Sequence, residues 1–178
     1  MLEQLRAQLA PDPHRHILEP VTVDIAIRSS DALTYEAEIV GYFSARLVVA
    51  DRYPGADAAP RTPAPLVNRR QTVATATQLY SDFWMFHGPA YRGVDRFEGI
   101  GDNGIDGQLR VSEGTGALLD NMGQLAGYWV MEQPDNCLAM PIGVDRIRFF
   151  GPDPEPGETL SAQVRVARLD ETSCESDH

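Results

Sequence analysis

Residues 116–131 read Gly116-Ala-Leu-Leu-Asp-Asn-Met-Gly-Gln-Leu-Ala-Gly-Tyr-Trp-Val-Met131, and this stretch decides the fold. A helix drawn through it is apolar on nearly every side, and such helices are normally buried. Its one carboxylate, Asp120, is costly to bury unless it is hydrogen-bonded or neutralised. Perturbed carboxylates of this kind concentrate at functional sites, so Asp120 is the first candidate for chemistry.

The residues that share the Asp120 face of this helix favour a functional interpretation. They form one stripe along the helix, made of Gly116, Gly123, Gln124 and Gly127. An interior glycine costs a helix roughly 1 kcal/mol relative to alanine, so three of them beside one acid suggest room for a ligand. The alternative is structural, with an acid at the helix N-terminus and glycines that allow close packing.

Composition limits the class of protein. The chain has 178 residues, 43% of them hydrophobic, and its 15 basic and 26 acidic residues give a net charge of −11. This charge argues against nucleic acid or an anionic membrane surface as a partner. With only Cys137 and Cys174 we expect no disulfide scaffold and a cytoplasmic location. The chain has no signal-peptide pattern and no apolar run of about 18 residues, so we expect neither secretion nor a membrane span.

Alternating patterns predict strands in the first third of the chain. Apolar and polar residues alternate over 21–28, 33–39 and 45–49, which is typical of half-buried antiparallel strands. A weak amphipathic pattern precedes them over residues 2–9. Residues 54–66 are rich in Pro and Ala and predict an extended linker. The predicted domains are therefore residues 1–53, the linker 54–66 and residues 67–178.

The second domain is predicted to be an antiparallel sheet around the apolar helix, an α+β fold. We expect strands at 70–79, 92–99, 104–111, 143–150 and 159–168. The Asn-Gly pair at 103–104 predicts a tight hairpin between two of these strands.

Three groups of residues carry the candidate chemistry. Helical spacing places the amide of Gln124 beside Asp120, where it can orient the carboxyl. A desolvated carboxyl can act as a general acid. The other two groups are the turn His87-Gly-Pro-Ala-Tyr-Arg-Gly93 and Pro141, which follows the helix.

Together these motifs resemble the second half of a polyketide synthase dehydratase domain, a double hot-dog fold. The family motif Tyr-Gly-Pro-x-Phe-Gln-Gly is similar to His87–Gly93, and its Asp-x-x-x-Gln/His motif is similar to Asp120–Gln124. Met140-Pro141-Ile142 is similar to the strand entry that follows. The resemblance covers about residues 70–170, and residues 17–50 resemble closing strands of a first hot dog. It implies a hot-dog fold and, for this chain, a partial double hot dog.

The resemblance implies syn elimination of water from a 3-hydroxyacyl thioester on an acyl carrier protein. Asp120 would be the acid and Gln124 its orienting partner, with His87, Gly88, Pro89, Tyr91, Gly93, Gly123 and Pro141 around the substrate. It implies no metal and no cofactor besides the carrier's phosphopantetheine. It also implies other synthase domains as partners and a homodimer. Carrier docking would need a basic patch, and Arg69, Arg70 and Arg92 are the candidates.

The chain departs from the family at the catalytic base. The family's His-x-x-x-Gly-x-x-x-x-Pro motif is missing, and His14 and His16 lack the matching Gly and Pro. His87 stands at the family's tyrosine position, where it is either an acid–base group or a structural hydrogen-bonding residue. We therefore expect the chain alone to be a weak or inactive dehydratase, and we interpret it as a fragment or an eroded dehydratase.

Two other functions stay open. A non-catalytic hot-dog module would bind an acyl chain or hold a dimer together. A thioesterase or cyclase-like domain would use the same pocket for hydrolysis or chain folding. Phe83, Trp84 and Phe86 fit either an acyl tunnel or the core. Asp102 and Asp106 fit turn chemistry better than a cation site.

Overall fold

The computed structural model describes residues 2–9, 21–29, 31–39, 43–53, 62–82, 84–134, 137–170 and 173–177. The chain divides into two compact units, Met1–Ala58 and Ala59–His178, and each is described by itself. The division falls within residues 54–66, the segment that the sequence predicts to be a linker.

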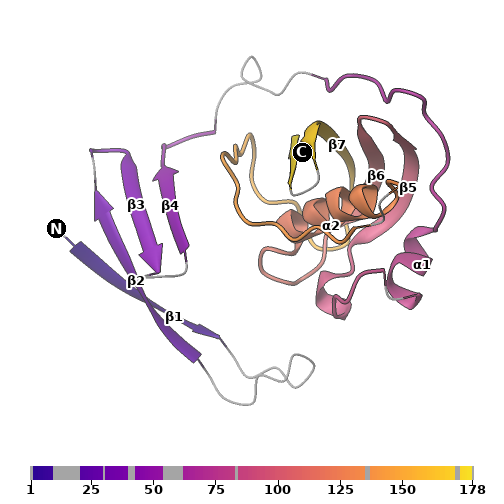
Figure 1. The fold of residues 1–178 in the computed structure, drawn as a ribbon. Coiled ribbons are helices and arrows are strands. Elements are labelled where there is room, and N and C mark those ends of the chain that lie inside the picture. The colour runs from indigo at the N-terminus through magenta and orange to yellow at the C-terminus, as the bar shows by residue number, and fades with distance from the viewer. Residues whose placement is uncertain are drawn as a thin grey trace. The chain divides into compact units, whose positions relative to one another are not determined.

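The first unit contains a four-stranded antiparallel sheet with the strand order β1-β2-β3-β4 (Figure 1). Its strands are β1 (Leu2–Leu9), β2 (Val21–Ser29), β3 (Thr34–Ile39) and β4 (Phe43–Val48). The last three match predicted strands. β1 is an additional strand, and it pairs with β2 along its whole length.

Asp31 holds the turn between β2 and β3. Its carboxyl accepts hydrogen bonds from the backbone N–H groups of Leu33 and Thr34 at 2.9 and 2.8 Å. These bonds, led by the one from Leu33, lower the pKa of Asp31 because they stabilise its charged form. The described residues of this unit contain no helix.

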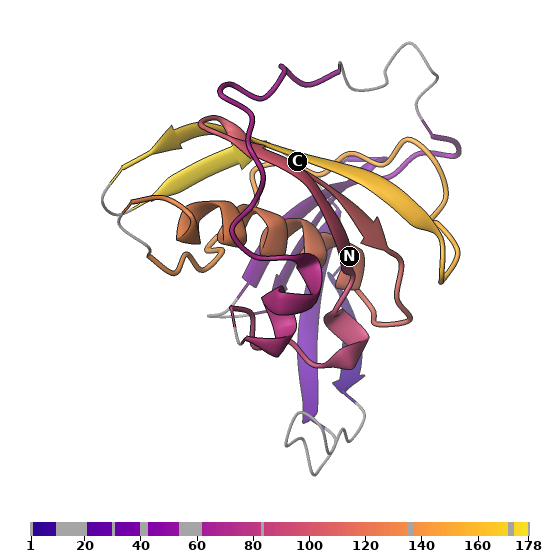
Figure 2. The same cartoon turned by 90° about the vertical axis from the view of Figure 1, so that its right-hand side faces the viewer.

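The second unit is a four-stranded antiparallel sheet that packs against one long helix. Strands β5 (Val94–Gly101), β6 (Gly104–Arg110), β7 (Thr159–Leu169) and β8 (Cys174–Asp177) are hydrogen-bonded in that order. The helix α2 (Ala117–Met131) packs on β5, β6 and β7. Figure 2 shows the sheet curving over α2. The antiparallel sheet around a central apolar helix is thus confirmed.

The helix and the sheet enclose one core. Its most buried side chains come from α2, from the strands and from the short helix α1 (Ala76–Ser81), and they are Leu79, Ile100, Ile105, Leu109, Leu125, Tyr128, Trp129 and Val164. Trp129 also donates its indole N–H to the carbonyl of Gly101 at 2.8 Å. This bond ties the last turn of the helix to the β5–β6 hairpin.

The predicted hairpin is present, and its turn depends on Gly104. This residue has a φ of +146°, and a Cβ there would overlap the carbonyl oxygen of Val164 on β7. Glycine meets both requirements because it lacks a Cβ and tolerates positive φ. The Asn103 side chain fastens the turn by accepting from the N–H of Val67 at 2.8 Å.

The prediction of a strand over residues 70–79 is wrong. Arg70 forms a single antiparallel bridge with Ile100, and the chain then enters α1. A capping box starts this helix: Thr75 Oγ1 accepts from the N–H of Gln78 at 3.2 Å, and the Gln78 side chain accepts from the N–H of Thr75 at 3.0 Å. This local Thr-x-x-Gln signal outweighs the alternating pattern.

The prediction of a strand over residues 143–150 is also wrong. This stretch has no regular secondary structure, and its apolar residues Val144, Ile147 and Phe149 are exposed. Alternation alone does not make a strand, because a strand needs the backbone hydrogen bonds of a neighbour. None of the described strands pairs with this stretch.

Candidate functional site

The candidate acid lies in the first turn of α2. Gly116 is the N-cap, in the left-handed conformation with a φ of +74°, so the helix interior begins at Ala117. Asp120 follows within the first turn, where the helix dipole stabilises negative charge. Its side chain is 37% exposed. The carboxyl is therefore half-buried, and not largely shielded as the sequence predicts.

Two buried amides stand beside Asp120 on the same helix. Gln124 is 2% exposed, and its Nε2 donates to Asp120 Oδ2 at 2.7 Å, as the helical spacing predicts. The same nitrogen lies 3.0 Å from Asn121 Oδ1 and 2.7 Å from the carbonyl oxygen of Tyr91. Asn121 is fully buried. Since buried amides keep one orientation only when their partners are fixed, this cluster holds Gln124 toward the carboxylate.

Tyr80 of α1 completes the cluster from the other side. Its hydroxyl donates to Gln124 Oε1 at 2.8 Å and accepts from the backbone N–H of Val94 at 3.0 Å. Burial, as the largest effect, raises the pKa of Tyr80 to about 12 because it disfavours the charged phenolate.

The turn formed by residues 87–93 is hydrogen-bonded to α2. Gly93 donates its backbone N–H to Asn121 Oδ1 at 3.0 Å, and Arg92 Nε donates to the carbonyl of His87 at 2.7 Å. A Cβ on Gly93 would overlap the Asn121 amide and lie 2.8 Å from the carbonyl oxygen of Arg110. Gly93 thus permits the close approach of this turn to the helix.

His87 lies directly against the candidate acid. Its Nε2 is 3.4 Å from Asp120 Oδ2, and its side chain is 17% exposed. The ring of Phe86 stacks on it with centroids 4.7 Å apart and planes at 16°. The other ring nitrogen, Nδ1, is buried and has no hydrogen-bond partner among the described residues. One histidine nitrogen therefore faces the acid, while nothing described orients the other.

The predicted glycine stripe is only partly a close-packed surface. A Cβ on Gly127 would lie 3.2 Å from Met85 Cε, whereas a Cβ on Gly123 would meet nothing within 4 Å. Gly116 lies outside the helix interior as its N-cap. Only Gly127 therefore fits the close-packing interpretation, and the space over Gly123 is open.

The remaining predicted substrate contacts are spread over several places. Gly88 and Pro89 enter the 3₁₀ turn η3 (Pro89–Tyr91), and both are exposed. The Tyr91 hydroxyl donates to the carbonyl of Thr115 at 2.8 Å, which ties η3 to the residues before α2. Pro141 is exposed in the irregular segment after α2. The turn around His87 thus lies at the site, and nothing in the described contacts links Pro141 to it.

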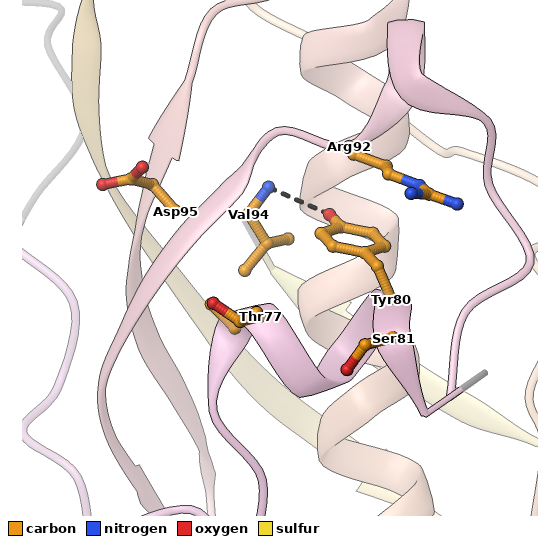
Figure 3. Close-up of a pocket in the computed structure, with 7 residues that line it drawn as sticks. Thr77, Tyr80, Ser81, Arg92, Val94 and Asp95 are labelled. Carbon is orange, nitrogen blue, oxygen red and sulfur yellow. Dashed lines mark hydrogen bonds between the residues drawn. The ribbon is translucent and has the colours of Figure 1, made fainter.

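A pocket of about 380 Å³ opens beside Tyr80 (Figure 3). It is lined by Ala76, Thr77, Tyr80, Ser81, Arg92, Val94 and Asp95. Figure 3 shows Arg92 and Asp95 on opposite sides of it, and the Arg92 guanidinium carbon lies 5.6 Å from the centre of the Tyr80 ring. The pocket borders the Asp120 cluster through Tyr80, but neither Asp120 nor His87 lines it.

The hairpin carboxylates have structural partners. Asp102 accepts from the Asn68 amide at 2.6 Å, and Asp106 pairs with Arg165 at 2.6 Å. Across the described residues, no group of three or more His, Cys, Asp or Glu side chains could hold a metal ion. The turn interpretation therefore fits Asp102, which lies in the β5–β6 turn, whereas Asp106 lies on β6 and its partner Arg165 on β7.

The aromatic candidates lie in different surroundings, and so do the basic ones. Trp84 packs edge-on against the buried Tyr128, whereas Phe86 is 69% exposed; Phe83 lies outside the described residues.

Two arginines of the candidate basic patch already have partners. Arg69 donates to the carbonyl of Glu98, and Arg70 lies 3.7 Å from the carboxylate of Glu132.

Two residues of the cluster, Tyr80 and Asn121, were not predicted from the sequence. Asn121 follows Asp120 directly and lies three residues before Gln124, so helical spacing alone could have placed it beside the Gln124 amide. Tyr80 directly follows the predicted strand 70–79, so no helical face was available to place it. His14 and His16 lie outside the described residues.

An antiparallel sheet around a central helix, with a polar cluster at the first turn of that helix, defines a hot-dog-type domain. The family described as Polyketide synthase dehydratase N-terminal domain matches residues 56–178, more than half of the chain. The chain therefore belongs to the polyketide synthase dehydratase family. No curated protein and no solved structure matches it. The family description refers to an N-terminal domain, so the likeness to the second hot dog stays a prediction.

The chain is thus a dehydratase-type module of a polyketide synthase. Among its described residues, no helix combines the length and the apolar character needed to cross a membrane.

Proposed function

We propose that this module eliminates water from a 3-hydroxyacyl thioester, with Asp120 as the acid and His87 as the base. The observation that carries this proposal is the 3.4 Å separation of His87 Nε2 and Asp120 Oδ2. A syn elimination removes the C2 proton and the C3 hydroxyl from one face of the substrate. An acid and a base that lie side by side suit this geometry, because both then approach the same face.

In the proposed step, His87 Nε2 takes the C2 proton as the C2–H electrons form the C2–C3 double bond. The C3–O bond breaks, and the leaving oxygen takes a proton from Asp120 and departs as water. Protonated His87 and ionised Asp120 are then left in contact. After the product leaves, His87 releases one proton to water and Asp120 takes up one proton from water, which restores the starting state.

The starting state needs a neutral His87 and a protonated Asp120. A bound acyl chain would cover the half-buried carboxyl, and desolvation favours the neutral pair over the ion pair. The unpartnered Nδ1 of His87 makes His87 a poorer base, since catalytic histidines are usually oriented through their second nitrogen. The lack of an orienting partner on Nδ1 fits the expectation that this chain is a weak or inactive dehydratase.

The substrate would arrive on the phosphopantetheine arm of an acyl carrier protein, within a cytoplasmic synthase and its homodimer. The carrier is acidic, so the net charge of −11 makes a local basic surface necessary. Arg70 is half-exposed, but Glu132 offsets its charge. Arg69 and Arg92 are therefore better candidates for docking than Arg70.

The experiment is incubation of the chain with a synthetic 3-hydroxyacyl thioester and detection of the enoyl product by mass spectrometry. His87→Ala should abolish whatever turnover the wild type shows. The matched control is the double variant His14→Ala/His16→Ala, which should retain it. Loss of turnover in the control with survival in His87→Ala would overturn the assignment of His87. Release of the free acid would indicate a thioesterase, and binding without any product a non-catalytic module.

A further inference from the structure

We propose that Tyr80 is a positioning residue that fixes the direction of the Gln124 amide, so that Gln124 donates to Asp120. This inference rests on the proposed function for its kinetic consequence, but its structural part does not need activity. Tyr80 belongs to no motif that carries the family resemblance, and it reaches the site from α1 rather than from α2.

The backbone of Val94 fixes the role of the Tyr80 hydroxyl. A backbone N–H can only donate, so the Tyr80 hydroxyl must accept the 3.0 Å hydrogen bond from Val94. Figure 3 shows this bond, with the Tyr80 hydroxyl directed at the Val94 nitrogen. The hydroxyl has a single proton, which is then free to point at Gln124, 2.8 Å away.

The direction of this bond decides which end of the amide faces which partner. Because Tyr80 donates, its partner on Gln124 is the oxygen Oε1, and the nitrogen must point to the opposite side. There Nε2 meets three oxygens, from Tyr91, Asp120 and Asn121. A reversed amide would place Oε1 against these three acceptors and leave the Tyr80 proton facing N–H groups.

The hydroxyl keeps its proton under the conditions where the module works. Burial raises the pKa of Tyr80 to about 12, so the group is a constant donor near neutral pH. The chain of bonds therefore has one direction, from Val94 through Tyr80 to Gln124. Since Gln124 occupies Asp120 Oδ2 as a donor, the proton for the leaving hydroxyl is carried by the other carboxyl oxygen, Oδ1.

The first test is a measurement that does not depend on turnover. The side-chain NH2 signals of Gln124 are identified in a ¹H–¹⁵N spectrum as the pair missing from Gln124→Leu. Because Gln124 is 2% exposed, this pair should exchange slowly in the wild type. In Tyr80→Phe it should shift and exchange at least about tenfold faster, as expected when one hydrogen bond is lost. An unchanged pair in Tyr80→Phe would overturn the proposal.

The matched control is Tyr128→Phe, which removes another core hydroxyl. That hydroxyl bonds to Glu132 and to the N–H of Ala74, away from the Asp120 cluster. The Gln124 pair should therefore keep its shift and exchange rate in Tyr128→Phe. A change of equal size in both variants would mean that the effect is general loosening of the core, and it would also overturn the proposal.

The second test is a kinetic double-mutant cycle with the 3-hydroxyacyl thioester. Tyr80→Phe should lower kcat about tenfold and leave KM within about twofold, since one oriented hydrogen bond is lost away from the bound chain. In a Gln124→Leu background the same substitution should change kcat by less than about twofold. Equal losses in both backgrounds would contradict positioning through Gln124. If no variant shows turnover, the proposed function fails and the NMR result alone decides the role of Tyr80.

Discussion

Gly93→Ala should be among the most damaging small substitutions in the second unit. An added Cβ would overlap the side-chain amide of Asn121 and lie 2.8 Å from the carbonyl oxygen of Arg110. Neither neighbour has room to move. Asn121 is fully buried, and Arg110 is fixed by its own N–H, which donates to the carbonyl of Gly93 at 2.7 Å.

The magnitude follows from two contributions. Overpacking one methyl group in a filled site costs about 1–3 kcal/mol. Displacing the turn also breaks the 3.0 Å hydrogen bond from Gly93 to Asn121, and a net bond is worth about 1 kcal/mol. We therefore expect a loss of about 3 kcal/mol in the free energy of unfolding of this unit. With an m-value of about 2 kcal/mol/M, the urea midpoint falls by about 1.5 M.

Tryptophan fluorescence is a suitable signal for this measurement, because the chain's two tryptophans, Trp84 and Trp129, both lie in the second unit. The matched control is Gly88→Ala. A Cβ at Gly88 meets nothing within 4 Å and its φ is −74°, so stability should stay level or rise by about 0.5 kcal/mol. Equal midpoints for Gly93→Ala and the wild type would refute the close approach of this turn to α2.

Two further predictions concern the same unit. Tyr80 has a pKa near 10.0 when unfolded and about 12 when folded, so the folded state holds its proton more tightly. This contribution to stability is complete below pH 10 and is lost as the pH rises toward 12; the urea midpoint of Tyr80→Phe should therefore fall less over that range than that of the wild type. Arg165→Met should cost about 2 kcal/mol, because it leaves the mostly buried carboxylate of Asp106 without its partner. Asp106→Asn in that background should recover part of the loss, and identical urea midpoints for the single and double variants would contradict this.

The parts of the fold that local patterns specify were predictable. Alternation and the Asn-Gly turn located β5 and β6, and the apolar stretch located α2 nearly to the residue. The strand prediction for residues 70–79 was wrong because the alternating pattern masks the Thr75–Gln78 capping box, a short-range signal that starts a helix. The strand prediction for residues 143–150 was wrong because an alternating pattern does not show whether a neighbouring strand is there to pair with.

The candidate site was predictable along one helix but not between elements. Spacing placed Gln124 against Asp120, and the structure has that bond at 2.7 Å. The contact of His87 with Asp120 joins residues 33 positions apart, and no local pattern encodes such a distance. The burial of Asp120 was overestimated because the apolar composition of α2 does not show where the helix begins. The helix begins at Ala117, so Asp120 lies in its half-exposed first turn.

The exposure of Asp120 also changes what its replacement should do to stability. If Asp120 were buried, as the apolar helix predicts, Asp120→Asn would hold or raise stability by removing a buried charge. With the side chain 37% exposed in the first helical turn, the favourable interaction with the helix dipole is lost instead. The cost should be about 0.5 kcal/mol, small enough to leave the fold intact.

Asp120→Asn therefore provides the most direct test of the account, because it removes the acid and keeps the shape of the side chain. The measurement is the rate of enoyl thioester formation from a synthetic 3-hydroxyacyl thioester, compared between the wild type and Asp120→Asn, with folding checked by tryptophan fluorescence. Since general acid catalysis contributes roughly 10²–10⁴-fold, we predict that any wild-type elimination falls at least about a hundredfold in the folded variant. Elimination that continues at the wild-type rate in folded Asp120→Asn would exclude Asp120 as the acid and contradict the account.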